Sequence, residues 1–225
     1  MTMTFRHFVA SFALLSVFLA SPARAVHASD LERAVNTGNL VQVRRLLAHG
    51  ADPDIRDRNK RTPLHDAILS FHRNTGCGLR MVQALLDAGA TPDIQDDCGA
   101  TALLHAVRLY RVHHSLELIR ILLANGADAD SPDGWGRTPL LLATENRQIE
   151  VCALLLRYGA NVNAASLKGE TPLHTAAGNG DVAGCRLLVE HGASTAAVDQ
   201  RGLTPLGIAQ WRQHKEAANY LQEVR

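Results

Sequence analysis

Histidine and cysteine are two residue types that could bind a metal ion, and four of them fall in two short segments. His72, Cys77, His113 and His114 offer imidazole nitrogens and a thiol, which are ligands that Zn²⁺ accepts in proteins. Their spacing matches no compact ligand motif, and exposed histidines are common in loops. We therefore expect no metal site, and these four residues are the candidates if the chain does hold an ion.

Signals for catalysis are missing from the sequence. It has no nucleophile elbow, no phosphate-binding loop, no Cys-x-x-Cys pair and no two carboxylates at a spacing that catalysis could use. The 23 lysines and arginines balance the 22 aspartates and glutamates, which excludes a strongly basic nucleic-acid-binding protein. With 20% charged and 46% hydrophobic residues, the chain is also not disordered. We expect a folded protein that is not an enzyme and needs no cofactor.

The elements that must position any site recur along the chain. A motif of threonine, then proline or alanine, then leucine begins at Thr62, Thr101, Thr138, Thr171 and Thr204. These threonines are 39, 37, 33 and 33 residues apart. A Gly-Ala pair recurs at the same spacing, at Gly50, Gly89, Gly126, Gly159 and Gly192. Two markers that keep one register indicate a repeat protein.

Each repeat is expected to form two short antiparallel helices. The threonine hydroxyl can cap a helix N-terminus, and the proline that follows takes the first helical position, where its missing N–H costs nothing. Leucine and alanine follow at helical spacing, and the glycine of the second series is suited to end the second helix. No unit can bury its apolar face alone, so neighbouring units must stack. Small alanines allow close packing, which suits a chain with only ten aromatic residues.

In these motifs the sequence resembles the ankyrin-repeat family, from about Ser29 to the C-terminus. The resemblance implies an all-α solenoid of helix-turn-helix units with β-hairpin or turn fingers between them. In the first unit Ser29 takes the place of the threonine. Histidines at the positions of His65 and His174 tie neighbouring units together in this family, so a structural role is implied for both. The units are a capping unit at 29–57, repeats at 58–96, 97–132, 133–165 and 166–198, and a C-terminal capping unit at 199–225.

The first 25 residues have the pattern of a cleaved signal peptide. Arg6 precedes an apolar run of about 13 residues, Phe8 to Ala20, and small residues follow up to Ala25. The run is shorter than the roughly 20 residues of a membrane-spanning helix, so we expect no membrane insertion. Cleavage after Ala25 or Ala28 would leave one domain, from residue 26 onward. The short, lightly charged leader is typical of bacteria and predicts a periplasmic protein, or alternatively a secreted one.

The repeat register also predicts the state of the four cysteines. Cys152 and Cys185 hold the same place in successive second helices, and stacked helices lie roughly 8 to 10 Å apart. That separation exceeds the roughly 7 Å Cα limit of a disulfide, so both should be small buried apolar residues. Cys98 falls at a finger tip and Cys77 in an insertion between helices. We expect both of these thiols to be accessible.

Two repeats are longer than the rest because they carry insertions, residues 71–76 and 110–113, between their helices. Two interpretations stay open: lengthened helices pack Phe71 against Tyr110, or the insertions form a partner-specific edge. The same region holds Cys77 and the candidate metal ligands. The alternative function is therefore a redox- or metal-responsive accessory protein that uses the His and Cys residues of the insertions.

The resemblance implies a concave binding face made of the finger tips and the exposed side of each first helix. By register this face comprises Arg58, Asn59, Arg61, Asp97, Cys98, Trp135, Arg137, Lys168, Glu170, Arg201, Leu203, Trp211 and Arg212. Tryptophan and arginine are the types most enriched at interface hot spots. Trp211 could instead cover the C-terminal end of the core. The face is locally basic, which predicts an acidic patch on the partner. We expect a monomeric, non-catalytic scaffold that binds a protein partner.

Overall fold

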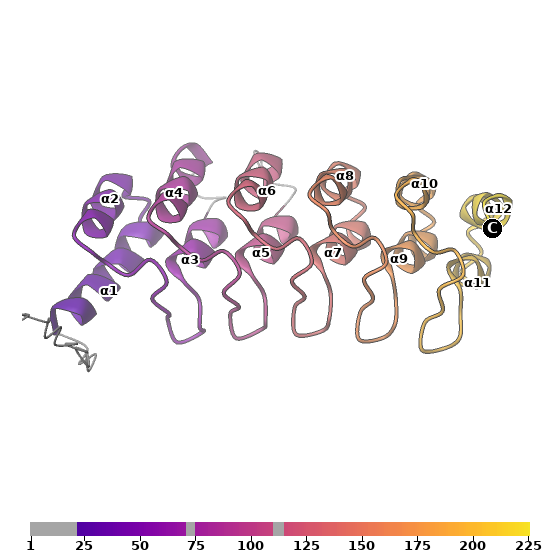
Figure 1. Cartoon of the computed structure of the whole chain (residues 1–225), viewed down its shortest axis with the longest axis horizontal. Coiled ribbons are helices and arrows are strands. Elements are labelled where there is room, and N and C mark those ends of the chain that lie inside the picture. Colours follow the sequence, from indigo (N-terminus) through magenta and orange to yellow (C-terminus); the bar gives the residue numbers. More distant parts are fainter. Residues whose placement is uncertain (1–21, 71–74, 110–114) are drawn as a thin grey trace, which may run out of the picture.

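Two rows of helices stack side by side in the computed structural model, which describes residues 22–70, 75–109 and 115–225 (Figure 1). The inner row consists of α1 (Pro22–Asn36), α3 (Pro63–Leu69), α5 (Ala102–Arg108), α7 (Pro139–Glu145), α9 (Pro172–Asn179) and α11 (Pro205–Trp211). The outer row consists of α2 (Leu40–Ala48), α4 (Thr75–Asp87), α6 (Ser115–Ala124), α8 (Ile149–Arg157), α10 (Val182–Glu190) and α12 (Lys215–Glu223).

Each inner helix packs against the outer helix of its own unit and against the inner helices on either side. The loops between units project beyond the inner row, on the side away from the outer row (Figure 1). Throughout the described residues the regular structure is helical, which confirms the predicted all-α solenoid; the loops are hydrogen-bonded turns rather than β-hairpins. None of the described helices combines the length and the apolar character that crossing a bilayer requires.

The threonine-proline pairs begin the inner helices as predicted. The Thr138 hydroxyl accepts the N–H of Leu141 at 3.3 Å, and Pro139 is the first helical residue. At Thr62 and Thr171 the cap is reciprocal, because the backbone N–H of each threonine also donates to Nδ1 of a histidine three residues later, at 3.1 and 3.2 Å. These local bonds satisfy N–H groups that a helix start otherwise leaves open.

Histidines connect one unit to the next where the reciprocal caps occur. Nε2 of His65 lies 3.2 Å from the carbonyl oxygen of Ala100, and Nε2 of His174 lies 3.0 Å from that of Leu203. Each ring therefore accepts at Nδ1 and donates at Nε2, which is the neutral form. Burial is the main reason that the pKa of each imidazole lies below its ordinary value. The predicted structural role of both histidines is confirmed.

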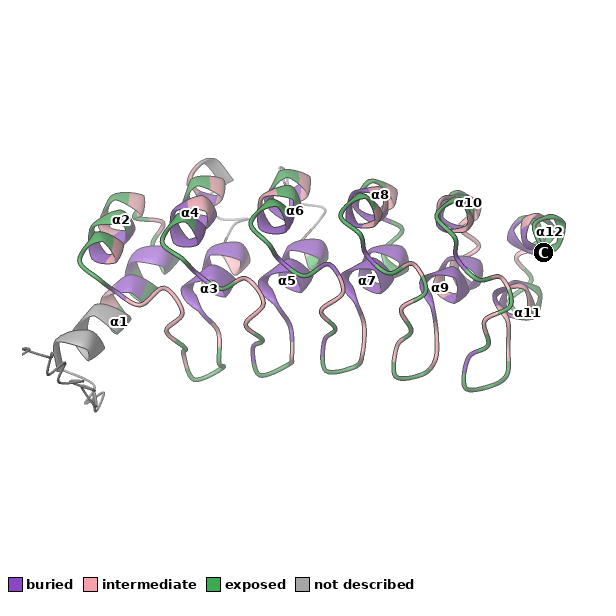
Figure 2. Cartoon of the chain, in the orientation of Figure 1, coloured by how far each residue is buried: buried purple, intermediate pink, exposed green. Residues whose placement is uncertain are grey.

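The core lies between the two rows and is built from aliphatic side chains. Among the described residues its large, fully buried members are leucines and isoleucines, such as Leu64, Leu103 and Ile119. Alanines with no exposed surface, including Ala106 and Ala176, let the inner helices approach one another. Burial therefore concentrates where the rows face each other, whereas the outer surfaces and the loop tips are exposed (Figure 2). The low aromatic content follows from this packing.

Two expectations about the N-terminal half were wrong. The first inner helix begins at Pro22 and not near Ser29, because the intervening Ala-rich stretch contains no helix breaker. Both predicted cleavage positions, Ala25 and Ala28, thus lie within α1. The insertion at 71–76 also ends in helix, since α4 begins at Thr75. Residues 1–21, Phe71, His72 and Tyr110 to His114 lie outside the described residues, so the predicted signal segment and the packing of the insertions stay predictions.

Candidate functional site

Five loops, the fingers, carry most of the predicted binding residues; they span 57–61, 96–100, 133–137, 166–170 and 199–203. Each is closed by a backbone hydrogen bond between its first and last residue, as from the Asp133 N–H to the Arg137 carbonyl at 3.0 Å. In the finger 133–137, Oδ1 of Asp133 accepts the N–H groups of Trp135 and Arg137 at 2.9 and 3.0 Å. The finger backbone is therefore held by its first side chain.

The same aspartate recurs in other predicted fingers, and its role as the hydrogen-bond acceptor was missed in the sequence. Asp57, Asp96 and Asp199 each accept the N–H groups two and four residues further along, at 2.8 to 3.0 Å. Ser166 takes the place of the aspartate in the fourth finger and accepts the Lys168 N–H at 3.2 Å. A signal was present, because all five of these residues lie five positions before the repeated threonine. An Asx-type turn in that position would have added this acceptor role to fingers that were already predicted.

Adjacent fingers are joined by single backbone hydrogen bonds. Gly134 donates to Cys98 at 3.1 Å, Leu167 donates to Trp135 at 3.3 Å, and Gln200 donates to Lys168 at 3.0 Å. The contact is close enough to require glycine at Gly136, whose φ is +74° and where an added Cβ would lie 2.8 Å from the Leu167 nitrogen. The finger tips therefore form one continuous ledge with a fixed spacing.

The structure places all of the predicted face residues at the surface. Arg61, Arg137, Glu170 and Leu203 are half-buried and the other nine are exposed. Trp135 is 57% exposed and Trp211 is 66% exposed. The alternative that Trp211 covers the C-terminal end of the core is therefore wrong. Single exposed apolar side chains are common, so an exposed indole indicates a binding site only where other apolar side chains lie beside it.

Two neighbouring fingers and two inner helices enclose a pocket of about 490 Å³, here called the Trp135 pocket. It is lined by Trp135, Arg137, Leu141, Glu145, Ser166, Leu167, Lys168, Glu170 and Thr175. Four predicted residues meet there: Trp135, Arg137, Lys168 and Glu170. Leu167, 68% exposed, was missed because the register selected its neighbour. Arg58 and Asn59 line a separate hollow at the first finger, so the predicted face is not one continuous site.

The charges around Trp135 are largely paired within the protein. Oδ2 of the buried Asp133 accepts Nε and Nη2 of Arg137, at 3.0 and 2.9 Å, and Nη2 of Arg108 from the preceding unit, at 3.1 Å. The Arg137 guanidinium lies 5.0 Å from the centre of the Trp135 ring, and its Nη1 is 3.5 Å from Oε2 of Glu145. Burial raises the pKa of Glu145, and the positive charge of Arg137 opposes that shift.

Arginines elsewhere on the face are also engaged. Arg201 pairs with Oδ2 of Asp199 at 2.7 Å and with Oε1 of Glu170 at 3.2 Å. Nη1 of Arg212 donates to the carbonyl of Gly178 at 2.9 Å. Because these arginines are engaged within the protein, the face offers a partner less free positive charge than its number of lysines and arginines suggests. Lys168 and Arg58 are exposed and form no ion pair with the described residues, so the free positive charge is local.

The cysteines fall into two classes. Cys152 is 3% exposed and Cys185 is not exposed at all, and burial raises their thiol pKa values to about 11 and about 12. Both are free, which confirms that they are small buried apolar residues. Cys98 is exposed at the tip of its finger, as predicted. Cys77 is half-buried in the first turns of α4 rather than in a loop, so its predicted accessibility is only partial.

Metal ligation finds little support in the part of the chain that is described. Of the four candidate ligands only Cys77 belongs to it, while His72, His113 and His114 lie outside. Asp96, Asp97 and Cys98 place ligand atoms within 4.8 Å of one another. Asp96, however, already accepts two backbone N–H groups and lies 2.8 Å from Nε2 of His105. The oxygens of Asp96 are therefore engaged in hydrogen bonds within the protein, and Asp97 and Cys98 do not make a metal site on their own.

Comparison with known protein families covers most of the chain. A model of ankyrin repeats (3 copies) matches residues 71–166 and 163–224, and a model of ankyrin repeats (many copies) matches residues 31–77. The B-cell lymphoma 3 protein homolog of Mus musculus is 35% identical over 152 residues, which are 63% of this chain and 32% of that protein. The chain thus spans about a third of the length of this curated relative.

Solved structures with the same fold align over nearly the whole chain. An ankyrin repeat domain from Acinetobacter baumannii AYE has a TM-score of 0.77 at 27% identity, covering 86% of this chain and 96% of that one. A chain in the structure of the Bd0816 predatory endopeptidase from Bdellovibrio bacteriovorus in complex with immunity protein Bd3460 has a TM-score of 0.71 at 25% identity. It covers 87% of this chain and 98% of that one.

Proposed function

Because the chain belongs to the ankyrin-repeat family, we propose that it is a non-catalytic scaffold that binds another protein through its concave face. The observation that carries this proposal is the pair of apolar side chains on neighbouring fingers, Trp135 at 57% and Leu167 at 68% exposure. Both belong to a ledge whose backbone is hydrogen-bonded from finger to finger. A rigid, exposed apolar surface gains most when a partner covers it.

The relatives support binding to a protein rather than to a small molecule. One of the similar chains occurs in a structure of an endopeptidase in complex with an immunity protein. A ledge of finger tips beside a row of inner helices is also an extended surface, as protein partners require. The predicted acidic patch on the partner would face Lys168 and Arg58, because Arg137, Arg201 and Arg212 are held by internal contacts.

We propose in addition that the protein is of bacterial type and is exported to the periplasm. The support is the basic residue, apolar run and small-residue segment of positions 1–25. Fractionation of cells that produce the full chain, followed by N-terminal sequencing, tests this. A periplasmic product that begins at Val26 or Ser29 is the expected result, and an unprocessed cytoplasmic chain contradicts it.

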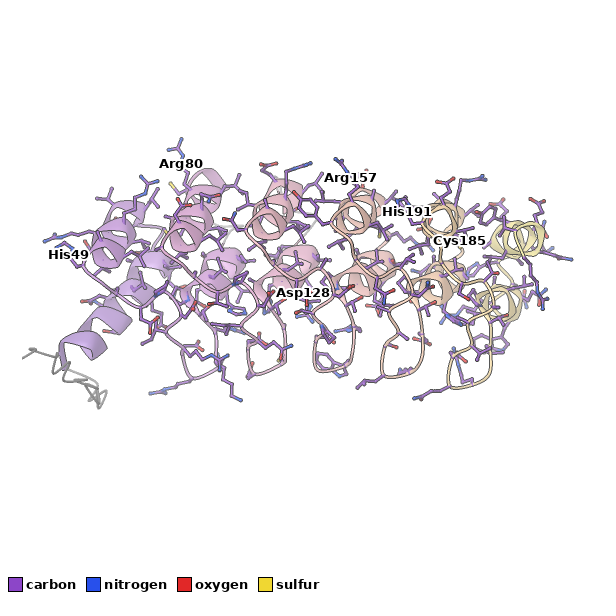
Figure 3. All side chains as sticks on the ribbon, viewed as in Figure 1. His49, Arg80, Asp128, Arg157, Cys185 and His191 are labelled. Atoms are coloured by element: carbon purple, nitrogen blue, oxygen red, sulfur yellow. The ribbon has the colours of Figure 1, made fainter. Side chains whose placement is uncertain are left out.

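Site-specific cross-linking tests the proposed binding face. A photoreactive amino acid is placed at Asp97 on a finger or at Arg157 on the outer row, where the Arg157 side chain points away from the fingers (Figure 3). Both positions are exposed, so neither change should disturb the fold. We expect irradiation of living cells to give a discrete adduct from position 97 alone. An adduct that forms only from position 157 would contradict the proposal.

Substitution at the same face provides the second test. Trp135→Ala removes an exposed ring and should abolish capture of the cross-linked partner while leaving thermal unfolding nearly unchanged. Arg137→Ala is less suitable, because Arg137 also neutralises the buried Asp133. Val41→Ala is the matched control, since Val41 is 80% exposed on the outer row. Equal capture by the Trp135→Ala and Val41→Ala variants would count against the concave face.

A further inference from the structure

We propose that the Trp135 pocket binds a short extended segment of the partner in which an apolar side chain is followed or preceded by a carboxylate. The inference rests on the proposed function and adds to it the chemistry of the bound segment. The pocket is small, about 490 Å³, which lies within the roughly 300–1,000 Å³ of typical ligand sites. It can take a few side chains of a partner, while the rest of the concave face contacts the surrounding surface.

The apolar part of the pocket is held in place before any partner arrives. The Trp135 ring carries the Arg137 guanidinium at 5.0 Å, and that arginine is fixed in turn by two bonds to the buried Asp133. The Trp135 carbonyl accepts the Leu167 N–H at 3.3 Å, which sets the distance between the two exposed apolar residues. Because these groups are already ordered, little conformational entropy is lost when an apolar side chain inserts beside them.

The charge pattern selects the neighbour of that apolar side chain. The carboxylates that line the pocket are paired, Glu145 with Arg137 at 3.5 Å and Glu170 with Arg201 at 3.2 Å. The buried Asp133 and Asp199 also accept two backbone N–H groups each, so these carboxylates are engaged within their own fingers. The ammonium group of Lys168 is exposed and forms no ion pair with the described residues.

A carboxylate on the ligand would therefore meet an unpaired cation. A basic ligand would find only carboxylates that already have partners, and it would face Lys168 as a like charge. The backbone of Lys168 is fixed, because its N–H donates to Ser166 Oγ at 3.2 Å and its carbonyl accepts the Gln200 N–H at 3.0 Å. Complementary charge at such a point gives specificity for the acidic segment.

Fluorescence of Trp135 tests the proposal with defined probes. The chain has two tryptophans, so Trp211→Phe leaves Trp135 as the sole indole. Three capped nine-residue peptides of Gly and Ser carry, at the centre, Asp-Leu-Glu, Lys-Leu-Lys or Asp-Ala-Glu. We expect the Asp-Leu-Glu peptide to shift the emission saturably, with an affinity at least about fivefold higher than that of either other peptide. No saturable change, or equal affinity for the three peptides, overturns the proposal.

A charge reversal with a matched control completes the test. In the Trp211→Phe background, Lys168→Glu should lower the affinity for the acidic peptide about tenfold and raise it for the basic peptide. Lys215→Glu makes the same charge change on α12, away from the fingers, and should leave both affinities within twofold. If the Trp211→Phe protein that keeps Lys168 prefers the basic peptide, the pocket assignment is refuted. The proposed function still stands in that case if position 97 cross-links to a partner. A partner that cross-links only through the outer row overturns both.

Discussion

The fingers 96–100 and 133–137 have the same backbone but hold it by different chemistry. In both, Oδ1 of the first aspartate accepts the N–H groups two and four residues on, at 2.9 to 3.0 Å. Oδ2 of Asp96 lies 2.8 Å from Nε2 of His105, whereas Oδ2 of Asp133 meets Arg108 and Arg137. One finger thus depends on an imidazole whose pKa is lowered, mainly by burial, and the other on the permanent charges of two arginines.

The two finger tips differ as much as their supports. Cys98 and Trp135 occupy the same position, two residues after the aspartate, and both are exposed. The backbone of a finger is set by its first residue, so the tip is free to vary without a change in the loop. Around 133–137 the supporting arginine also contacts the tip ring, which joins support and binding surface. Around 96–100 the supporting histidine is buried against His65 and has no such contact with the tip.

Removal of the supporting carboxylate should have the largest effect. Asp133→Ala leaves two guanidinium groups and two N–H groups without their acceptor, and we expect a loss of about 3 kcal/mol in the free energy of unfolding. Asp96→Ala should cost about 1 kcal/mol less, because His105 can stay neutral. Urea unfolding followed by circular dichroism at pH 7.5 measures both, with the exposed Asp97→Ala as control. Equal losses at the two fingers would show that the permanent charges are not what distinguishes them.

Much of the scaffold could be predicted because its causes are local. Threonine followed by proline and leucine begins an inner helix in four units, and the histidines at 65 and 174 bond within the same turn and to the next unit. The regular period then places every finger tip at the surface. The support of the fingers could not be predicted in the same way, since Arg108 reaches Asp133 from another unit, 25 residues away.

The charge of the face could not be predicted from the sequence either, because it depends on which side chains pair with one another. Counting residues makes the face basic, but Arg137 and Arg201 each turn back toward a buried aspartate of their own finger. Side-chain geometry decides which cation is free to meet a partner. Lys168 can be identified as that cation only once the ion pairs of the neighbouring arginines are known. The start of α1 was missed for the converse reason: helix-forming residues upstream of Ser29 continue the helix without needing a cap.

Contact between neighbouring fingers should show in the cost of adding a methyl group. Gly136 has φ +74° and an added Cβ would lie 2.8 Å from the Leu167 nitrogen; at Gly99, φ is +74° and the Cβ would lie 2.8 Å from the Gly134 nitrogen. Gly202, φ +76°, has open space. We expect Gly136→Ala and Gly99→Ala each to cost about 2 kcal/mol, against about 1 kcal/mol for Gly202→Ala, which is strained but unobstructed. Thermal and urea unfolding of the three variants compare them; a Gly202→Ala cost as large as the others would mean that finger contact contributes little.

Acid should loosen the finger 96–100 and spare 133–137. Burial is the main reason that the pKa values of His65 and His105 lie below 6.5, although Asp96 raises that of His105 and Arg61 and Arg108 lower it further. As the pH falls through 6.5 the unfolded chain binds protons first, so stability is lost, by up to about 1.4 kcal/mol per pH unit for each proton. Asp66 has the opposite effect, because burial raises its pKa to about 6 and the folded chain gains a proton there.

Amide hydrogen exchange separates the two fingers in one experiment. In an Asp66→Asn background, protection of the Cys98 and Ala100 amides should fall about threefold to tenfold between pH 7.5 and pH 5.5, after correction for intrinsic rates. The Trp135 and Arg137 amides, whose acceptor Asp133 is paired with arginines, should keep their protection. His105→Gln should remove the pH dependence at Cys98. A parallel loss at both fingers would point to global unfolding instead.

The smallest effect concerns the reactivity of the finger tip itself. Cys98 is exposed, but the charge of Asp97 is the main cause that raises the pKa of its thiol, so less reactive thiolate is present near neutral pH. Asp97→Asn should therefore speed the reaction of Cys98 with a maleimide severalfold at pH 7.5, without a change in stability.

Cys152 and Cys185 are the internal controls, since burial raises the pKa values of their thiols to about 11 and about 12 and they should react only on unfolding. Mass spectrometry of labelled peptides gives the three rates separately. If Asp97→Asn leaves the Cys98 rate unchanged, solvent access alone sets the reactivity of the Cys98 thiol. The chemical difference between the two fingers then lies wholly in the residues that support them.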